Sequence, residues 1–249
     1  MPKIGTLKTC GLFESGSYWR LLDVANGYSS SKGYSLATQV AIGRRIQVLL
    51  SSDSDIAIAS KRIKVRLLED GYTCWIDIFS LLGKVTISKP WKPIWLSFDE
   101  INERLEQVLQ WVGDSSKKQN SYLWGGTLGP DFDCSGLVQA AFASQEIWLP
   151  RDAYQQEEFC HLVNDSLDDL TSLKPGDLIF FGDSLKCTHV AIYKGGGFYW
   201  HSSGLENGRN GIGCDSLIHF EKDSVASYYK SLFRSVGRIQ KCHDGSILP

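Results

Sequence analysis

DFDCSGLVQAAF, residues Asp131–Phe142, places one cysteine between an aspartate and a serine at the start of an apolar run. Apolar residues recur at helical spacing beyond it, so the sequence predicts a helix from Cys134 to about Trp148 that Pro150 closes. Asp133 is a favourable N-cap residue. Because unpaired amides and the helix dipole stabilise an anion at a helix start, we expect the Cys134 thiol to have a lowered pKa and to protrude from the helix.

A cysteine nucleophile needs a base that takes its proton, and two histidines follow in THVAIY and YWHSSG. Strand alternation directs His189 away from Val190 and Ile192, and the short KGGG turn predicts that His201 lies beside His189 on a neighbouring antiparallel strand. Together with Cys134 they form a pattern of nucleophile, base and orienting group. The alternative is a buried structural cysteine and two unrelated histidines.

The front of the chain, residues 1–88, predicts short strands. RIKVRLLEDG alternates Ile63, Val65 and Leu67 on one face, and YTCWIDI follows the turn as a second strand. A small antiparallel barrel is expected here, because closure hides the strand edges. The next segment, residues 89–96, is a stiff connector rich in proline and tryptophan.

The composition changes after this connector. SFDEINERLEQVLQWVG carries an apolar helical stripe, a capping box formed by Ser97 and Glu100, and Gly113 as a stop. LKPGDLIFFG, THVAIYKGG and GFYWHSSG are strand-like runs separated by glycine turns. We therefore expect a second domain of helices and strands over residues 97–242, followed by a tail over residues 243–249.

These motifs also carry a family resemblance. DFDCSGLVQAAF, LKPGDLIFF, THVAIY and YWHSSG, with YLWGG upstream and LPRDAYQQ downstream of the cysteine, resemble the NlpC/P60 family of papain-like cell-wall peptide peptidases over residues 97–240. The front half resembles a bacterial SH3-like domain. The whole arrangement is similar to the γ-D-glutamyl-L-diamino acid endopeptidases of cyanobacteria and Bacillus. The resemblance implies an N-terminal all-β SH3-like barrel and a C-terminal α+β papain-like domain with an antiparallel sheet.

Carried over by motif, the resemblance implies a role for each site residue. Cys134 becomes the nucleophile, His189 the base and His201 the residue that orients it. The Tyr122 hydroxyl and the Cys134 backbone amide become the donors to the oxyanion. The residues expected to bind substrate, including its free amino terminus, are Tyr72, Glu69, Asp70, Asp133, Ser135, Arg151 and Trp124. The alternative for the two acids of EDG is a solvated turn.

The resemblance implies hydrolysis of the γ-D-glutamyl-L-diamino acid bond in murein tripeptide or tetrapeptide fragments with a free N-terminal L-Ala, in cell-wall peptide recycling. The residues by themselves indicate only a Cys/His hydrolase. Two alternatives stay open: an amidase or acyltransferase of the same superfamily, and a non-catalytic protein that binds wall peptides. An intact set of Cys134, His189 and His201 argues against the second alternative.

Composition argues against several other classes of protein. The formal net charge of −2 gives no basic surplus for nucleic acid, and no apolar stretch reaches the ~18 residues of a membrane span. The Cys and His spacings match no zinc motif and no phosphate loop occurs, so we expect neither metal nor cofactor. Because the seven cysteines lack a disulfide-like framework and the N-terminus lacks a secretory signal, we expect a cytoplasmic protein. We also expect a monomer.

Overall fold

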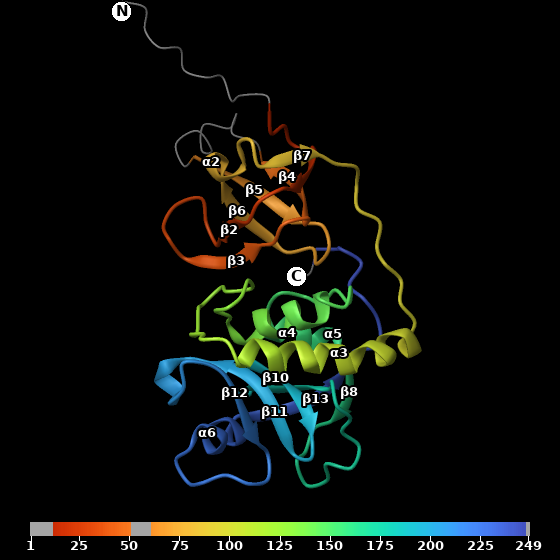
Figure 1. Ribbon diagram of the computed structural model, residues 1–249, viewed down its shortest axis with the longest axis vertical. Coiled ribbons are helices and arrows are strands. Elements are labelled where there is room, and N and C mark those ends of the chain that lie inside the picture. Colours follow the sequence, from red (N-terminus) through yellow and green to blue (C-terminus); the bar gives the residue numbers. More distant parts are fainter. Residues whose placement is uncertain (1–11, 51–60, 248–249) are drawn as a thin grey trace, which may run out of the picture. The chain divides into compact units, whose positions relative to one another are not determined.

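The computed structural model describes residues 12–50 and 61–247 (Figure 1). Its contacts divide the chain into two compact units. The first unit comprises the residues up to Leu68 together with Tyr72–Trp91, and the second comprises Glu69–Gly71 together with the residues from Lys92 onward. Each unit has its own buried core and is described by itself below.

The first unit is a seven-stranded antiparallel sheet with the strand order β3-β2-β6-β5-β4-β1-β7. Its elements are β1 (Tyr18–Leu21), β2 (Ala25–Tyr28), β3 (Leu36–Val40), β4 (Arg45–Leu50), β5 (Arg62–Leu67), β6 (Thr73–Asp77), α2 (Ile78–Leu81) and β7 (Val85–Ile87). The predicted alternation in β5 is confirmed, because Ile63, Val65 and Leu67 are fully buried. The expected closed barrel is not found: over residues 12–50 and 61–247 the sheet ends at β3 and β7, which do not pair.

The second unit surrounds a six-stranded antiparallel sheet with the order β12-β11-β10-β9-β13-β8. The three glycine-separated motifs predict β9, β10 and β11, and the other three strands were not predicted. Its strands are β8 (His161–Asn164), β9 (Leu178–Gly182), β10 (Cys187–Gly195), β11 (Phe198–Ser203), β12 (Gly211–Ser216) and β13 (Phe233–Arg238). Its helices are α3 (Phe98–Ser116), α4 (Cys134–Ala143), α5 (Ala153–Phe159), the single turn η1 (Leu205–Asn207) and α6 (Val225–Ser231). Helices α3, α4 and α5 cover one face of the sheet, and α6 lies on the other (Figure 1).

The capping residues in the sequence predict the starts of α3 and α4 correctly, but the predicted ends of both helices are wrong. The predicted capping box is confirmed: the Ser97 hydroxyl accepts from the Glu100 amide, and the Glu100 carboxylate accepts from the Ser97 amide. Helix α3 continues past Gly113, so the predicted stop is wrong there. Helix α4 ends earlier than predicted, and Glu146 then takes a left-handed conformation with a φ of 61°.

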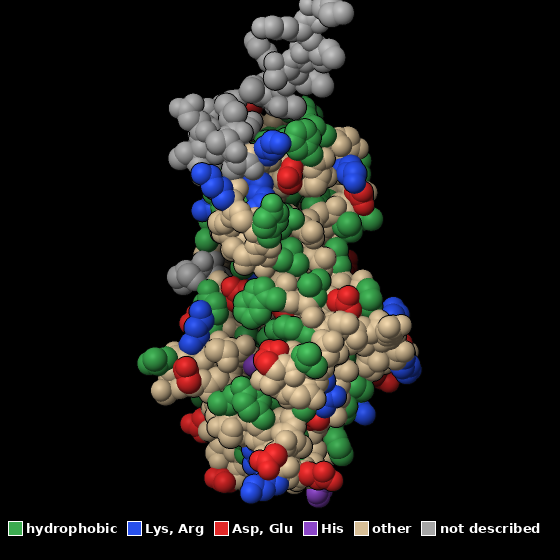
Figure 2. Space-filling model, turned by 90° about the vertical axis from the view of Figure 1, so that its left-hand side faces the viewer, with side chains coloured by type: hydrophobic (Ala, Val, Ile, Leu, Met, Phe, Trp, Pro, Cys, Tyr) green, Lys and Arg blue, Asp and Glu red, His purple; other side chains and the backbone are tan. Residues whose placement is uncertain are grey.

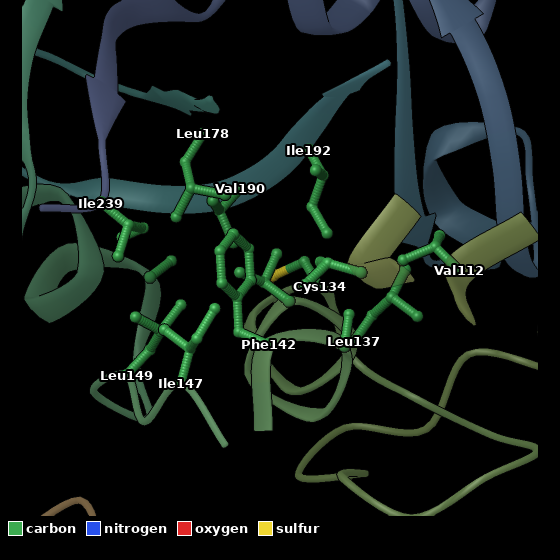
Figure 3. Close-up of a cluster of buried hydrophobic side chains, with 14 of the residues drawn as sticks. Val112, Cys134, Leu137, Phe142, Ile147, Leu149, Leu178, Val190, Ile192 and Ile239 are labelled. Atoms are coloured by element: carbon green, nitrogen blue, oxygen red, sulfur yellow. The ribbon is translucent and has the colours of Figure 1, made fainter. Parts of the chain in front are cut away.

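Two apolar clusters hold the second unit together, one on each face of its sheet. The first joins α3 and α4 to β9 and β10, and Figure 3 shows Leu137, Phe142, Val190 and Ile192 within it. The second packs α6 against the opposite face of the sheet. The described end of the chain also belongs to this unit, since the buried His243 donates its amide to the Trp148 carbonyl at 2.8 Å.

The described surface carries charges of both signs. On the face drawn in Figure 2, Lys and Arg side chains are interspersed with Asp and Glu side chains, in keeping with the net charge of −2. Among residues 12–50 and 61–247, no helix has both the length and the apolar composition needed to cross a membrane.

Candidate active site

The first turn of α4 holds Cys134. As predicted, Asp133 is the N-cap residue, and its carboxylate accepts the Gly136 amide at 2.6 Å. The expectation of a protruding thiol is wrong: Cys134 is only 6 % exposed and belongs to the apolar cluster between the helices and the sheet (Figure 3). The sulfur is buried because α4 packs directly onto β10, where the Val190 backbone N–H donates to the thiol.

Burial also decides the acidity of this thiol. Desolvation raises the pKa of Cys134 to about 12, and the adjacent Asp133 carboxylate adds to the rise. The amides of Val190 and Ser135 and the Arg151 guanidinium act in the opposite direction but do not compensate. The expected lowering of this pKa is therefore wrong, since desolvation outweighs the helix N-terminus. Such a thiol needs a neighbouring base to become a thiolate.

The two histidines of the sequence pattern lie side by side on adjacent strands. His189 is on β10 and His201 is on β11, and the strands pair antiparallel. His189 Nε2 lies 2.8 Å from His201 Nδ1, and the two rings are nearly perpendicular at 87°. The predicted neighbourhood of the two side chains is confirmed. Burial lowers the pKa of both imidazoles, that of His189 to well below its ordinary value, so both rings are neutral at pH 7.

A third polar group extends this pair. His201 Nε2 lies 2.7 Å from the Asp215 carboxylate on β12, and Arg209 Nη2 donates to both Asp215 oxygens at 2.6 and 2.7 Å. Sequence analysis missed both residues. The signal available was weak, because Asp215 lies in the glycine-rich run GIGCDS, which has no regular apolar alternation to reveal its register against β11.

A tyrosine from α6, on the face of the sheet opposite to α4, contacts the His189 ring. Tyr229 of α6 stacks on the imidazole with ring centroids 4.1 Å apart. Its hydroxyl shares a 2.7 Å hydrogen bond with Ser203 Oγ and accepts from Asn207 Nδ2 at 3.0 Å. Nothing in the sequence links α6 to the histidines, so Tyr229 was also missed. The stacked ring restricts the orientation of the imidazole.

Tyr122 lies close to Cys134, in the segment that forms a single bridge with Phe132. Burial raises the pKa of its hydroxyl, and the nearby Asp133 carboxylate raises it further. The phenol therefore stays protonated and can donate a hydrogen bond. Its role at the oxyanion stays a prediction.

Asp133, Ser135 and Arg151 form one buried network. Arg151 is 1 % exposed, and its guanidinium donates to the Asp133 carboxylate at 2.6 Å and to the Ser135 hydroxyl at 2.9 Å. The Gly125 amide donates to the same carboxylate at 2.9 Å. With the capping bond to Gly136, these donors occupy the acceptor sites of Asp133. The proposed contact with a substrate amine stays a prediction and would need further acceptors.

The other residues expected to bind substrate differ in burial and do not all lie in the same unit. Glu69 and Asp70 are each 2 % exposed, so the solvated turn considered for them is wrong, and Asp70 accepts from Gln139 Nε2 at 2.9 Å. Trp124 is 70 % exposed. Tyr72 lies in the first unit, packed against that unit's core, and its link to the site stays a prediction. In the described part of the chain, no group of three His, Cys, Asp or Glu side chains is arranged to hold a metal ion.

A family match falls on the same residues as these features: a buried thiol at a helix start that accepts from the amide next to His189, and a hydrogen-bonded histidine pair on the sheet. Residues 119–233 match the family model described as the NlpC/P60 family. The second unit thus carries an NlpC/P60 domain.

Two relatives and one solved structure illustrate the similarity. The bifunctional muramidase/DL-endopeptidase CwlT of Bacillus subtilis is 32 % identical over 154 residues, which are 60 % of this chain and 40 % of that protein. A γ-D-glutamyl-L-lysine dipeptidyl-peptidase of Bacillus cereus is 41 % identical over 111 residues, 43 % of this chain and 32 % of that protein. The structure of NlpC1 from Trichomonas vaginalis covers 97 % of this chain and 98 % of its own, with 18 % identity and a TM-score of 0.48. The chain thus spans less than half the length of both curated relatives.

Proposed function

We propose that this protein is a cysteine peptidase that hydrolyses the γ-D-glutamyl-L-diamino acid bond of murein peptides with a free N-terminal L-Ala. The observation that carries the proposal is a buried Cys134 thiol that accepts from the Val190 amide, one residue beyond His189, together with the neutral, hydrogen-bonded pair of His189 and His201. A neutral imidazole held by a partner is the form that can accept a thiol proton.

The reaction is acyl transfer in two halves. His189 takes the Cys134 proton as the sulfur attacks the γ-carbonyl carbon of D-Glu, and the Cys134 amide and the Tyr122 hydroxyl donate to the oxyanion. Protonated His189 then gives its proton to the leaving amine of the diamino acid, and a thioester remains. A water molecule, deprotonated by His189, attacks the thioester and releases L-Ala-D-Glu and the free thiol.

The resting protonation state follows from the two pKa shifts. The pKa of Cys134 is about 12 and that of His189 is well below its usual value, so thiol and imidazole are both uncharged before substrate binds. A thiolate–imidazolium pair is then not the starting state, and the proton moves during the attack. A substrate that displaces water and brings its carbonyl to the sulfur is therefore part of the activation.

The substrate class rests on the relatives. The Bacillus cereus relative is named a γ-D-glutamyl-L-lysine dipeptidyl-peptidase, which fits removal of a dipeptide from a free amino end. The buried carboxylates of Glu69 and Asp70 would favour a cationic amino group over a neutral acyl group. We also propose that the protein works in the cytoplasm, on recycled tripeptide and tetrapeptide fragments.

The test compares L-Ala-γ-D-Glu-L-Lys and its meso-diaminopimelate counterpart with the same peptides carrying an N-acetyl group, with products identified by mass spectrometry. Release of L-Ala-D-Glu from the free peptides alone is the expected result. Equal rates on both forms would overturn the amino-terminal specificity. Transfer of the acyl group to an added amine would identify an acyltransferase, and peptide binding without turnover or thiol labelling would identify a binding protein.

A further inference from the structure

We propose that Asp215, held by Arg209, is a positioning residue that sets the tautomer of both histidines, so that His189 presents an unprotonated Nδ1 to its proton donor. The proposal rests on the peptidase function proposed above, because it assigns the basic atom of that reaction. Asp215 touches neither substrate nor thiol in this scheme and acts through His201.

The tautomers of the two histidines follow from a series of hydrogen bonds that begins at the Asp215 carboxylate. An ionised carboxylate only accepts, so His201 Nε2, at 2.7 Å from Asp215, must carry the proton. The neutral His201 ring then has a lone pair on Nδ1, and this atom accepts from His189 Nε2 at 2.8 Å. His189, also neutral, is left with its lone pair on Nδ1. Asp215 thus sets the tautomer of His201, and His201 sets the tautomer of His189.

The β12 strand is built to hold this carboxylate. In the register of β11 and β12, Asp215 pairs with Tyr199, and Gly213 pairs with His201. A Cβ at Gly213 would collide with the Arg209 guanidinium, so the absence of a side chain there makes room for the arginine over the strand. Arg209 reaches both oxygens of Asp215 and fixes the plane of the carboxylate.

The surroundings of Asp215 keep its carboxylate ionised. Burial opposes ionisation of Asp215, but the His201 hydrogen bond and the Arg209 charge lower the pKa of its carboxyl overall. The titratable groups that contact the His201 ring are His189, Asp215, Tyr199 and Tyr229, and the two phenols keep their protons because burial raises their pKa. Asp215 is therefore the anionic group among the contacts of His201.

A purely structural role for the Arg209–Asp215 pair is the competing explanation, and a matched ion pair separates the two. Arg238 on β13 donates to Asp177 at 2.7 Å in the same unit, and the other side-chain bonds of this pair go to the Ser172 carbonyl and the Lys174 amide. Asp215→Asn and Asp177→Asn each remove one carboxylate from an arginine, and these two acidic side chains are 13 % and 2 % exposed. An amide at position 215 can donate to His201 Nε2 and so permits the reversed tautomers, in which His189 Nδ1 carries the proton.

The first experiment measures the tautomers directly by ¹⁵N NMR of the histidine side chains in the full-length protein, without any substrate. We expect protonated Nε2 on both rings in the wild type and in Asp177→Asn, and a mixture or reversal in Asp215→Asn. This readout stands even if the protein turns out to have another activity, so the failure of the tautomer assignment and the failure of the proposed function are distinguishable. Unchanged tautomers in Asp215→Asn would overturn the proposal.

The second experiment is a double-mutant cycle with His201→Asn, whose amide oxygen can still accept from His189 but does not tautomerise. We expect Asp215→Asn to lower kcat about 10- to 100-fold with little change in KM in the wild-type background. In the His201→Asn background the same change should cost less than about threefold. Equal losses in both backgrounds, or an equal loss in Asp177→Asn, would assign Asp215 a structural role and overturn the proposal.

Discussion

Tyr229 lies parallel to the His189 imidazole, 4.1 Å away between ring centroids and tilted by only 25°. Helix α6 lies on the face of the sheet opposite to α4 and provides the aromatic ring that contacts His189, the proposed base. When His189 takes a proton, the aromatic face next to it stabilises the new positive charge.

The first prediction separates the ring of Tyr229 from its hydroxyl. Tyr229→Phe keeps the stacked ring and should retain kcat within about threefold, whereas Tyr229→Leu should lose about 1 kcal/mol of stabilisation of the imidazolium, or about fivefold in kcat. Steady-state kinetics of both variants on the free tripeptide provides the measurement. Equal losses in both variants would show that the hydrogen bonds to Ser203 and Asn207 matter, and not the stacking.

The second prediction concerns the buried thiol. Cys134→Ala should abolish hydrolysis and, because the side chain is 6 % exposed within an apolar cluster, should also lower the free energy of unfolding by about 1 kcal/mol through the small cavity that it leaves. Cys242→Ala is a matched control, since Cys242 is 5 % exposed in the same cluster and its thiol donates to the Glu146 carbonyl and not to the histidine strands. That control should lose similar stability and keep its activity. Turnover near the wild-type rate in Cys134→Ala would remove this residue from the mechanism.

The third prediction ranks the two histidines. His189→Ala should be as damaging to kcat as Cys134→Ala, because a nucleophile and its base act as a unit. His201→Ala should be milder, since His189 keeps its stacked partner Tyr229. Pre-steady-state measurement of thioester formation checks both variants at the step where the base acts. An essential His201 with a dispensable His189 would reverse the assigned roles.

The start of α4 and the neighbouring histidines could be predicted because each depends on residues close in the sequence. Asp133 caps the helix that follows it, and the short glycine turn after β10 fixes how β10 pairs with β11. Asp215 could not be predicted in the same way. Its contact with His201 depends on the register of β12, and a glycine-rich strand carries no apolar pattern that would set this register.

The error in the pKa of Cys134 has the same origin. A helix N-terminus is visible in the sequence, and by itself it lowers a thiol pKa. Desolvation depends on what the helix packs against, here the Val190 side of β10, and only the folded chain reveals it. Tyr229 was missed for a related reason, because α6 is brought to His189 by the sheet and not by proximity along the chain.

The fourth prediction concerns stability at mildly acidic pH. Burial holds the pKa of His189 well below its value of about 6.5 in the unfolded chain, so below that pH the unfolded state binds a proton that the folded state does not. The free energy of unfolding should therefore fall as the pH drops from 7 to 5, by at most about 1.4 kcal/mol per pH unit for this group. Urea unfolding at several pH values measures the slope. His189→Gln should reduce this slope, and His201 and His243, whose pKa values burial also lowers, account for part of what remains. An unchanged slope would contradict the assignment of His189 as a buried neutral group.

The last prediction concerns the ion pair behind the nucleophile. Arg151→Met removes one partner of a pair whose side chains are 2 % and 9 % exposed, and it leaves the Asp133 carboxylate buried with only its hydrogen bonds. Breaking such a pair costs about 3–5 kcal/mol. The pair between Lys117 and Asp114 is exposed, so Asp114→Asn should change stability by less than about 1 kcal/mol.

The double variant Asp133→Asn, Arg151→Met tests whether the two side chains act together. It should lose less stability than the sum of the single variants, because removing the second charge no longer leaves an unpaired ion. Since Asp133 also caps α4, Arg151→Met should displace the first turn of that helix and lower kcat as well as stability. Urea unfolding and kinetics on the same preparations measure both quantities. A cost in Arg151→Met no larger than that of Asp114→Asn would show that this buried pair does not hold the nucleophile's helix in place.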